Sequence, residues 1–150
     1  MSTSQSAETD FDSILGRRVL LAEDDAAMRT LLACRLRRAG FQVTEAGSGV
    51  EALERLSQGW ADAPTIAFNV VVSDVRMPGY DGLNILASLR QTGAYVPVIL
   101  ITAFGTLATH VLAVRLGAYA ILDKPFDIDD LVSRVSAAAR GDPLRKPTSV

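Results

Sequence analysis

Three acidic side chains stand at the ends of short, mainly apolar runs in this 150-residue sequence. Glu23 and Asp24 follow the run 19–22, and Asp74 follows the run 70–73. If these carboxylates lie close together, their mutual repulsion raises at least one pKa unless a cation lies between them. Mg²⁺ takes one or two carboxylates together with waters and backbone oxygens. The three acids therefore indicate a site for Mg²⁺ (or Mn²⁺).

Two later apolar runs also end in side chains that suit phosphoryl chemistry. Thr102 ends the run 96–102, and Lys124 stands two residues after the run 119–122. A threonine hydroxyl can donate a hydrogen bond to a phosphoryl oxygen, and a lysine ammonium is a mobile point charge. Phosphoryl transfer depends mainly on in-line positioning and on neutralising the charge on oxygen. A carboxylate beside a cation, a hydroxyl and an ammonium therefore indicates phosphoryl chemistry.

The apolar runs predict five β-strands. Three consecutive valines at 70–72 are typical of a strand buried on both faces of a parallel sheet. The sequence Pro78-Gly79 then ends this strand. Residues 41–46 alternate between apolar and polar types, which predicts a half-exposed edge strand. The remaining strands are expected at 19–22, 96–102 and 119–122.

Helical spacing of apolar residues separates these strands. The helices are expected at 26–39, 48–56, 83–89, 107–116 and 128–139. In the fourth helix, the apolar positions at helical spacing are Leu107, Val111, Val114 and Leu116.

Strict alternation of strand and helix predicts an α/β fold with a doubly wound five-stranded parallel sheet, a (βα)5 chain. The flavodoxin-like strand order 2-1-3-4-5 puts the alternating second strand at an edge and the apolar strands inside. In that order, strands 1 and 3 are neighbours, and the direction of winding reverses between them. Ligands of such sheets bind at this switch point, beside the carboxyl ends of the strands. Glu23, Asp24 and Asp74 are expected there.

Composition limits the classes of protein to which this chain can belong. The net charge of −2, from 15 basic and 17 acidic residues, gives no overall basic field for nucleic acid, and neither a helix-turn-helix nor a basic stripe is evident. A single cysteine suits a reducing compartment, and no apolar run reaches the length of a membrane span. We expect a cytoplasmic protein with a flexible segment at 1–16, one domain at 17–140 and a flexible tail or linker at 141–150.

Separated motifs together resemble the receiver domain of bacterial two-component response regulators, the CheY-like superfamily. They are Glu23-Asp24, Asp74, Thr102 and Lys124-Pro125, in this order and each at a strand end. The resemblance covers residues 17–140. The segments 73–78 and 101–106 are most similar to receivers of the nitrogen-regulation type.

The resemblance implies a role for each of these residues. Asp74 would accept a phosphoryl group from a histidine of a sensor kinase or a phosphotransfer protein. Glu23 and Asp24, with Asp74 and the backbone carbonyl of Arg76, would hold Mg²⁺. Thr102 would be the switch hydroxyl and Lys124 would bind the phosphoryl oxygens. The family commonly has a cis bond before the proline that corresponds to Pro125.

The resemblance also implies how phosphorylation would be passed on. The surface formed by the fourth helix, the fifth strand and the fifth helix would change and act on a downstream protein, a missing effector domain or a second copy of the chain. Ile121 stands where the family often has a switch tyrosine or phenylalanine. Tyr119, two residues earlier, is expected on the same face of the strand. The domain would catalyse only its own phosphorylation and dephosphorylation.

A second hypothesis is a Mg²⁺-dependent phosphatase with an aspartyl nucleophile. Such enzymes have an Asp-x-Asp motif in which the second acid acts as general acid. Here position 76 is an arginine, and no cap-like insertion is visible. Arg76 and Phe104 are expected to flank the pocket. His110, the only histidine, is expected to face solvent from its helix.

Overall fold

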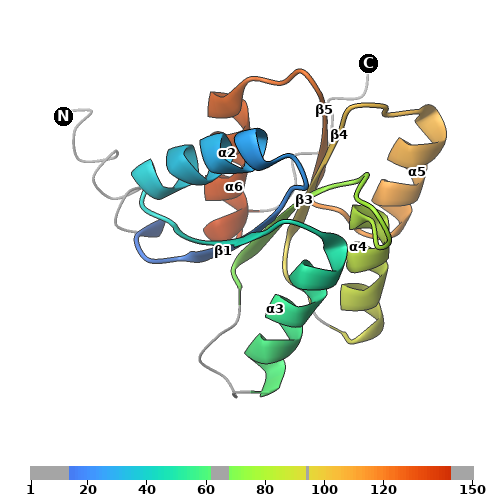
Figure 1. Cartoon of the computed structure of the whole chain (residues 1–150), viewed down its shortest axis with the longest axis horizontal. Helices are drawn as coiled ribbons and strands as arrows, with labels where there is room; N and C mark the ends of the chain where they lie inside the picture. Colours follow the sequence, from blue (N-terminus) through green and yellow to red (C-terminus); the bar gives the residue numbers. More distant parts are fainter. Residues whose placement is uncertain (1–13, 62–67, 94, 143–150) are drawn as a thin grey trace.

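The computed structural model describes residues 14–61, 68–93 and 95–142. Five parallel strands form a single sheet in the order β2-β1-β3-β4-β5 (Figure 1). They are β1 (Arg18–Ala22), β2 (Gln42–Ala46), β3 (Val70–Asp74), β4 (Val98–Thr102) and β5 (Ala120–Asp123). The predicted fold class and strand order are confirmed. All residues of β3 and β4 are buried, whereas β2 is mostly half-exposed, as expected for an edge strand.

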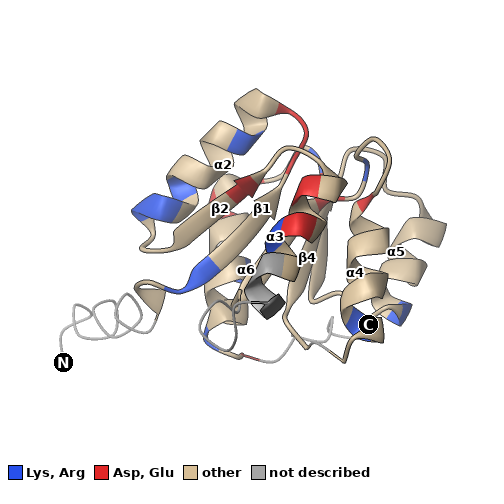
Figure 2. Cartoon of the chain, turned by 60° about the horizontal axis from the view of Figure 1, so that its bottom comes forward, with Lys and Arg blue, Asp and Glu red and all other residues tan. Residues whose placement is uncertain are grey.

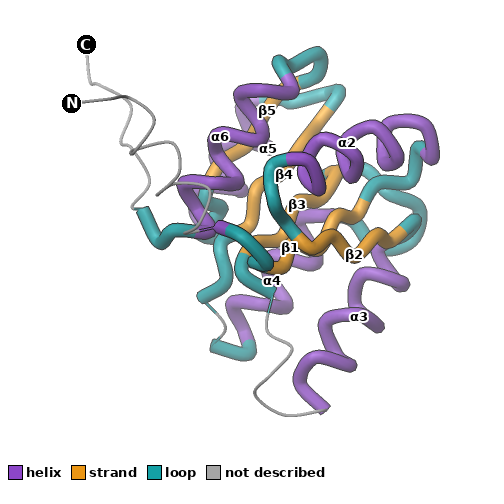
Figure 3. Tube along the Cα trace, turned by 90° about the vertical axis from the view of Figure 1, so that its left-hand side faces the viewer, coloured by secondary structure: helices purple, strands orange, loops and turns teal. Residues whose placement is uncertain are grey.

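In the described part of the chain, a helix follows each strand, and these five helices cover both faces of the sheet. They are α2 (Ala26–Arg38), α3 (Gly49–Ala61), α4 (Gly82–Gln91), α5 (Leu107–Arg115) and α6 (Ile128–Ala139). Residues of α2 and α6 pack into one apolar cluster, and residues of α3, α4 and α5 pack into a second cluster. Figure 3 shows the strands between α2 and α6 on one side and α3 and α4 on the other. The sheet is therefore doubly wound.

Short polar side chains begin most of the helices. Asp25, Asp81, Thr106 and Asp127 each accept a hydrogen bond from a backbone N–H in the first turn of the following helix. These bonds satisfy donors that would otherwise lack a partner at a helix start. Each cap therefore fixes where the loop after the preceding strand ends.

Most of the apolar positions expected in α5 are exposed. Leu107 is 82% exposed and Val114 is 70% exposed, while Ala113 is the residue of this helix that is fully buried. Apolar spacing indicates that a stripe exists, but docking against the sheet decides which stripe is covered. Here α5 turns Ala113, followed by the half-buried Leu116, toward the sheet.

The prediction that Tyr119 shares a face with Ile121 is also wrong. Strand β5 begins at Ala120, so the two-residue period does not extend back to Tyr119. Tyr119 packs against the cluster on the α2 and α6 side, and its hydroxyl donates to the Asp142 carbonyl at 3.2 Å. Ile121 packs against the opposite cluster.

The described ends of the chain pack against the domain. Ile14, which falls in the segment predicted to be flexible, is buried, and the Gly16 N–H donates to the Gly40 carbonyl at 3.0 Å. At the other end, the Asp142 N–H donates to the Ala137 carbonyl. Residues 1–13 and 143–150, which include most of both predicted flexible segments, lie outside the described residues. Among the described helices, none has the length and apolar character needed to cross a bilayer.

Candidate functional site

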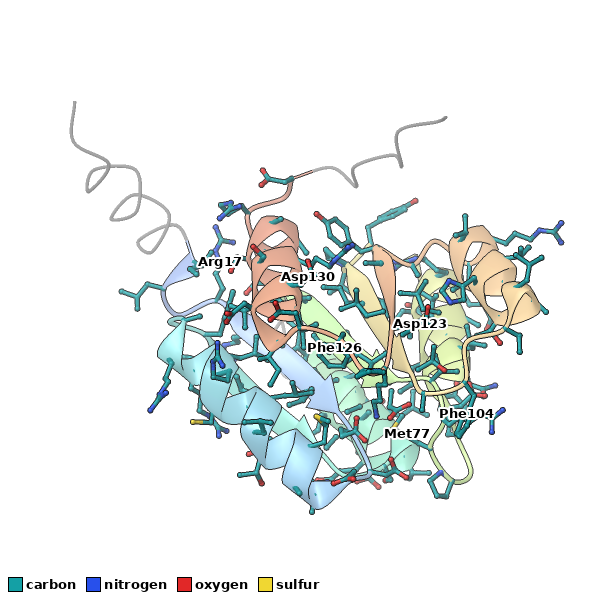
Figure 4. All side chains as sticks on the ribbon, turned by 90° about the horizontal axis from the view of Figure 1, so that it is seen from above. Arg17, Met77, Phe104, Asp123, Phe126 and Asp130 are labelled. Atoms are coloured by element: carbon teal, nitrogen blue, oxygen red, sulfur yellow. The ribbon has the colours of Figure 1, made fainter. Side chains whose placement is uncertain are left out.

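Four predicted site residues lie at the carboxyl ends of four neighbouring strands. Glu23 follows β1, Asp74 ends β3, Thr102 ends β4 and Lys124 follows β5. Glu23, Asp74 and Thr102 are buried, although all are polar, and Lys124 is half-buried. Figure 4 views the molecule with this end of the sheet toward the reader. Buried polar groups cost free energy unless they have partners, so their partners define what this site can do.

The ammonium of Lys124 joins the two buried carboxylates. Its Nζ lies 2.8 Å from Oδ2 of Asp74 and 3.3 Å from Oε2 of Glu23. The other oxygen of each carboxylate accepts a backbone N–H. Oδ1 of Asp74 accepts from Arg76 at 3.0 Å, and Oε1 of Glu23 accepts from Asp25 at 3.2 Å. Both acids are therefore held in place, with Asp74 at the centre.

The electrostatics of this cluster favour a further positive charge. Burial, and then repulsion from Asp74, raises the pKa of Glu23 from 4.5 to about 7, although Lys124 opposes this shift. Burial alone would lower the pKa of Lys124, but its hydrogen bond to Asp74 and the charges of Asp74 and Glu23 raise that pKa above its ordinary value. One ammonium thus faces more negative charge than it neutralises.

Three carboxylates of the cluster could hold a metal ion. Glu23, Asp24 and Asp74 each offer an oxygen, and these oxygens all lie within 4.8 Å of one another. Asp24 is exposed, so the group opens to solvent on its side. Hard carboxylate oxygens with an open side fit Mg²⁺, which retains several waters. The cluster therefore fits the cation that the sequence predicts.

Thr102 lies beside the carboxylates on the next strand. Asp74 pairs in register with Ile101, which places Thr102 one residue further along β4. Its Oγ1 accepts the Phe104 N–H at 3.2 Å, and its carbonyl accepts the Lys124 N–H at 2.7 Å. The hydroxyl is thus tied to the loop before α5, and the backbone of Thr102 positions Lys124.

Arg76 and Phe104 stack on each other beyond the ends of β3 and β4. The Arg76 guanidinium carbon lies 4.9 Å from the centre of the Phe104 ring, a cation–π contact between the loops that follow β3 and β4. Phe104, labelled in Figure 4, is 64% exposed. The two residues predicted to flank the pocket therefore also touch each other.

His110 faces solvent only in part. It is half-buried, and its Nε2 lies 3.0 Å from Oδ1 of Asp123, the residue before Lys124. A Cβ atom at Gly105 would lie 2.0 Å from the same carboxylate oxygen and 2.7 Å from Nε2 of His110. The pair links α5 to the end of β5 beneath the loop that follows Thr102. Sequence reasoning missed it because the two residues lie 13 positions apart.

Two further predicted residues have defined places. The Lys124-Pro125 peptide bond is cis. Ile121 is half-buried and pairs in register with Leu100 of β4. It packs on the side of the sheet that α3, α4 and α5 cover.

Comparisons with known proteins agree with this geometry. The response regulator receiver domain family matches residues 19–136. The chain is 37% identical over 134 residues to the transcriptional regulatory protein FixJ of Bradyrhizobium diazoefficiens, a match that covers 88% of the chain and 62% of FixJ. It is 39% identical over 120 residues to the DNA-binding transcriptional regulator NtrC of Escherichia coli, covering 80% of the chain and 24% of NtrC. The match thus spans less than two-thirds of either relative.

A solved structure shows the same fold. The receiver domain of the Francisella response regulator 1452 superposes with a TM-score of 0.74 at 30% sequence identity. The superposition covers 84% of this chain and 98% of that domain.

Proposed function

The chain belongs to the family of response regulator receiver domains, and we propose that it accepts a phosphoryl group on Asp74. The donor would be a phosphohistidine of a sensor kinase or of a phosphotransfer protein. The observation that carries the proposal is the position of Asp74, buried at the end of the central strand with the Lys124 ammonium 2.8 Å from one oxygen. That oxygen already lies beside the positive charge of Lys124, which a phosphoryl group would need for neutralisation.

The transfer is a single displacement at phosphorus. An oxygen of Asp74 forms the new O–P bond while the N–P bond to the donor histidine breaks, and the imidazole nitrogen keeps the electron pair. Lys124 then shifts from the carboxylate to a phosphoryl oxygen, which its flexible side chain allows. A Mg²⁺ (or Mn²⁺) ion held by Glu23, Asp24, Asp74 and the backbone carbonyl of Arg76 would neutralise the charge on the transferred oxygens.

Thr102 and Ile121 would report the modification. A phosphoryl group adds a charge of about −1.5 to −2, and the Thr102 hydroxyl would turn toward it as a donor. That rotation breaks its bond to the Phe104 N–H and releases the loop 103–106. Ile121, smaller than an aromatic switch residue, would follow inward.

The output surface would be α5, β5 and α6. The apolar side chains exposed along α5 support this proposal. Its partner would be a downstream protein, an effector domain or a second copy of the phosphorylated chain. FixJ and NtrC are transcriptional regulators longer than the matched region, which supports an effector domain. We assign the receiver to residues 17–140 and the protein to the cytoplasm, with no contact of the domain itself with nucleic acid or membrane.

Intact-mass measurement with acetyl phosphate and Mg²⁺ tests the proposal. The wild-type chain is expected to gain the mass of one phosphoryl group, and Asp74→Asn none. Asp130→Asn, a change of an exposed aspartate on α6, serves as the matched control and keeps the label. Chelation of Mg²⁺ with EDTA is expected to abolish labelling. Equal labelling of Asp74→Asn and wild type would overturn the assignment, and sustained turnover of a simple phosphate ester would favour a phosphatase.

A further inference from the structure

Arg29 joins three separate segments beside the acidic cluster. It lies in the first half of α2, and its Nη1 donates to the backbone carbonyl of Glu23 at 2.8 Å. Its Nε lies 3.7 Å from a carboxylate oxygen of Glu45 in β2. A Cβ atom at Gly47 would lie 3.1 Å from the same Nη1. Figure 2 shows acidic residues in the loop before α2 and in β2, with basic residues along α2 beside them.

The bond from Arg29 to the Glu23 carbonyl holds the second polar group of the Glu23 backbone. The Glu23 N–H already donates to the Ala46 carbonyl at 3.0 Å, at the end of β2. With its carbonyl held by Arg29, the residue is anchored on both sides. The Glu23 carbonyl belongs to the peptide group that leads into Asp24, so its orientation also sets where the Asp24 carboxylate projects.

We propose that Arg29 is a positioning residue for the cation site, which itself rests on the proposed function. The guanidinium holds the peptide between Glu23 and Asp24 so that both carboxylates converge with that of Asp74. Groups that orient metal ligands typically change metal affinity about 10- to 100-fold when they are removed. Arg29 would act in this way through the backbone rather than through a carboxylate.

The positive charge of Arg29, taken alone, would have the opposite effect on Mg²⁺ affinity, so an experiment can distinguish the two roles. A cation beside three carboxylates repels an incoming Mg²⁺, so removal of that charge alone would tighten Mg²⁺ binding. Loss of positioning weakens binding. The direction of the change therefore separates the two roles.

Arg37 supplies a matched control from the same helix. Its Nη2 lies 3.2 Å from Glu45 and donates to the Val43 carbonyl at 3.1 Å. It thus makes the same two kinds of contact as Arg29, an ion pair and a backbone carbonyl bond, but on β2 instead of on the acidic loop. Glu45→Gln removes the ion pair and leaves the Arg29–Glu23 bond.

The experiment is calorimetric titration of the whole chain with Mg²⁺. Arg29→Gln is expected to raise the dissociation constant at least about 10-fold, whereas Arg37→Gln and Glu45→Gln stay within about 2-fold of wild type. Unchanged or tighter binding by Arg29→Gln would overturn the proposal. If wild type itself bound no Mg²⁺, the proposed function would fail instead.

Lysine variants keep the test decisive if Arg29→Gln does not fold. Arg29→Lys retains the charge and one mobile donor, so it is expected to bind several-fold more weakly than Arg37→Lys. Backbone amide shifts of Glu23, Asp24 and Asp25, recorded without metal, should differ from wild type in the Arg29 variant alone. Equal affinities of the two lysine variants would overturn the proposal.

Discussion

The guanidinium of Arg76 stacks on the ring of Phe104, 4.9 Å from its centre, and so joins the loops that follow β3 and β4. Each of these residues stands two positions beyond a site residue, Asp74 or Thr102. If Asp74 is phosphorylated as we propose, the stack would stand between the phosphoryl group and the solvent next to these loops. Exposed cation–π contacts contribute about 0.5–1 kcal/mol, which is enough to bias which loop arrangement is populated.

Disruption of this stack is expected to shorten the lifetime of phosphorylated Asp74. Arg76→Ala and Phe104→Ala each open the mouth of the site to water, so each should speed dephosphorylation several-fold. The double variant should be no faster than the quicker single variant, because one contact is lost in both cases. Phosphate release after removal of the donor measures the half-lives, and values equal to wild type would remove this role.

Burial of Glu23 predicts how stability depends on pH when Mg²⁺ is absent. Its pKa of about 7 lies above the ordinary 4.5, so between these values the folded chain binds more protons than the unfolded chain. The contribution of this group is fully present below pH 4.5 and is lost as the pH rises through about 7. We expect the free energy of unfolding to fall by about 1–3 kcal/mol from this group between about pH 5 and pH 8.

Urea denaturation in EDTA at a series of pH values measures this fall. Glu23→Gln cannot ionise and should show a flatter profile than wild type. Saturating Mg²⁺ should also flatten the wild-type profile, because the cation replaces the proton. A wild-type profile as flat as that of Glu23→Gln would contradict a raised pKa for Glu23.

The sheet was predictable because its signals are local. Consecutive valines at 70–72 indicate a central strand, and the alternation from Gln42 to Ala46 indicates an edge. Strand order then follows from burial and winding rules. The convergence of Glu23, Asp74 and Lys124 follows from that order, since parallel strands end at one edge of the sheet. The chemical roles of these residues remain predictions.

The features that the sequence did not predict depend on how the elements dock against one another rather than on the local pattern of residues. The spacing of Leu107, Val111 and Val114 cannot say which stripe of α5 meets the sheet. A start of β5 one residue later than expected moves Tyr119 to the other face. The bond from Arg29 to a backbone carbonyl leaves no trace in residue types, because every residue carries that acceptor.

The His110–Asp123 pair is expected to depend on Gly105. A Cβ at residue 105 would lie 2.0 Å from the Asp123 carboxylate, so Gly105→Ala must push that side chain away from His110. Asp123→Ala breaks the same pair, a partly exposed hydrogen bond that contributes about 0.5 kcal/mol. The cost of Gly105→Ala should therefore be smaller in the Asp123→Ala background than in wild type.

A double-mutant cycle by thermal or urea unfolding measures this coupling. His110→Ala also removes the pair, so it should likewise reduce the loss of unfolding free energy caused by Gly105→Ala. Gly93→Ala is the control, because an added Cβ there would meet no atom within 4 Å, and its cost should be the same in both backgrounds. Full additivity of Gly105→Ala and Asp123→Ala would show that the glycine acts independently of the pair.

Among the described glycines, Gly49 is expected to tolerate a side chain least. A Cβ there would lie 1.7 Å from the Tyr80 carbonyl oxygen, and a backbone oxygen cannot rotate away as a side chain can. Gly49→Ala must separate the start of α3 from the loop that carries Arg76, at a cost of about 2–4 kcal/mol. Val50→Ala, the next residue and 56% exposed, should cost less than about 1 kcal/mol. Chemical denaturation compares the two variants, and equal costs would show that this contact does not restrain the loop.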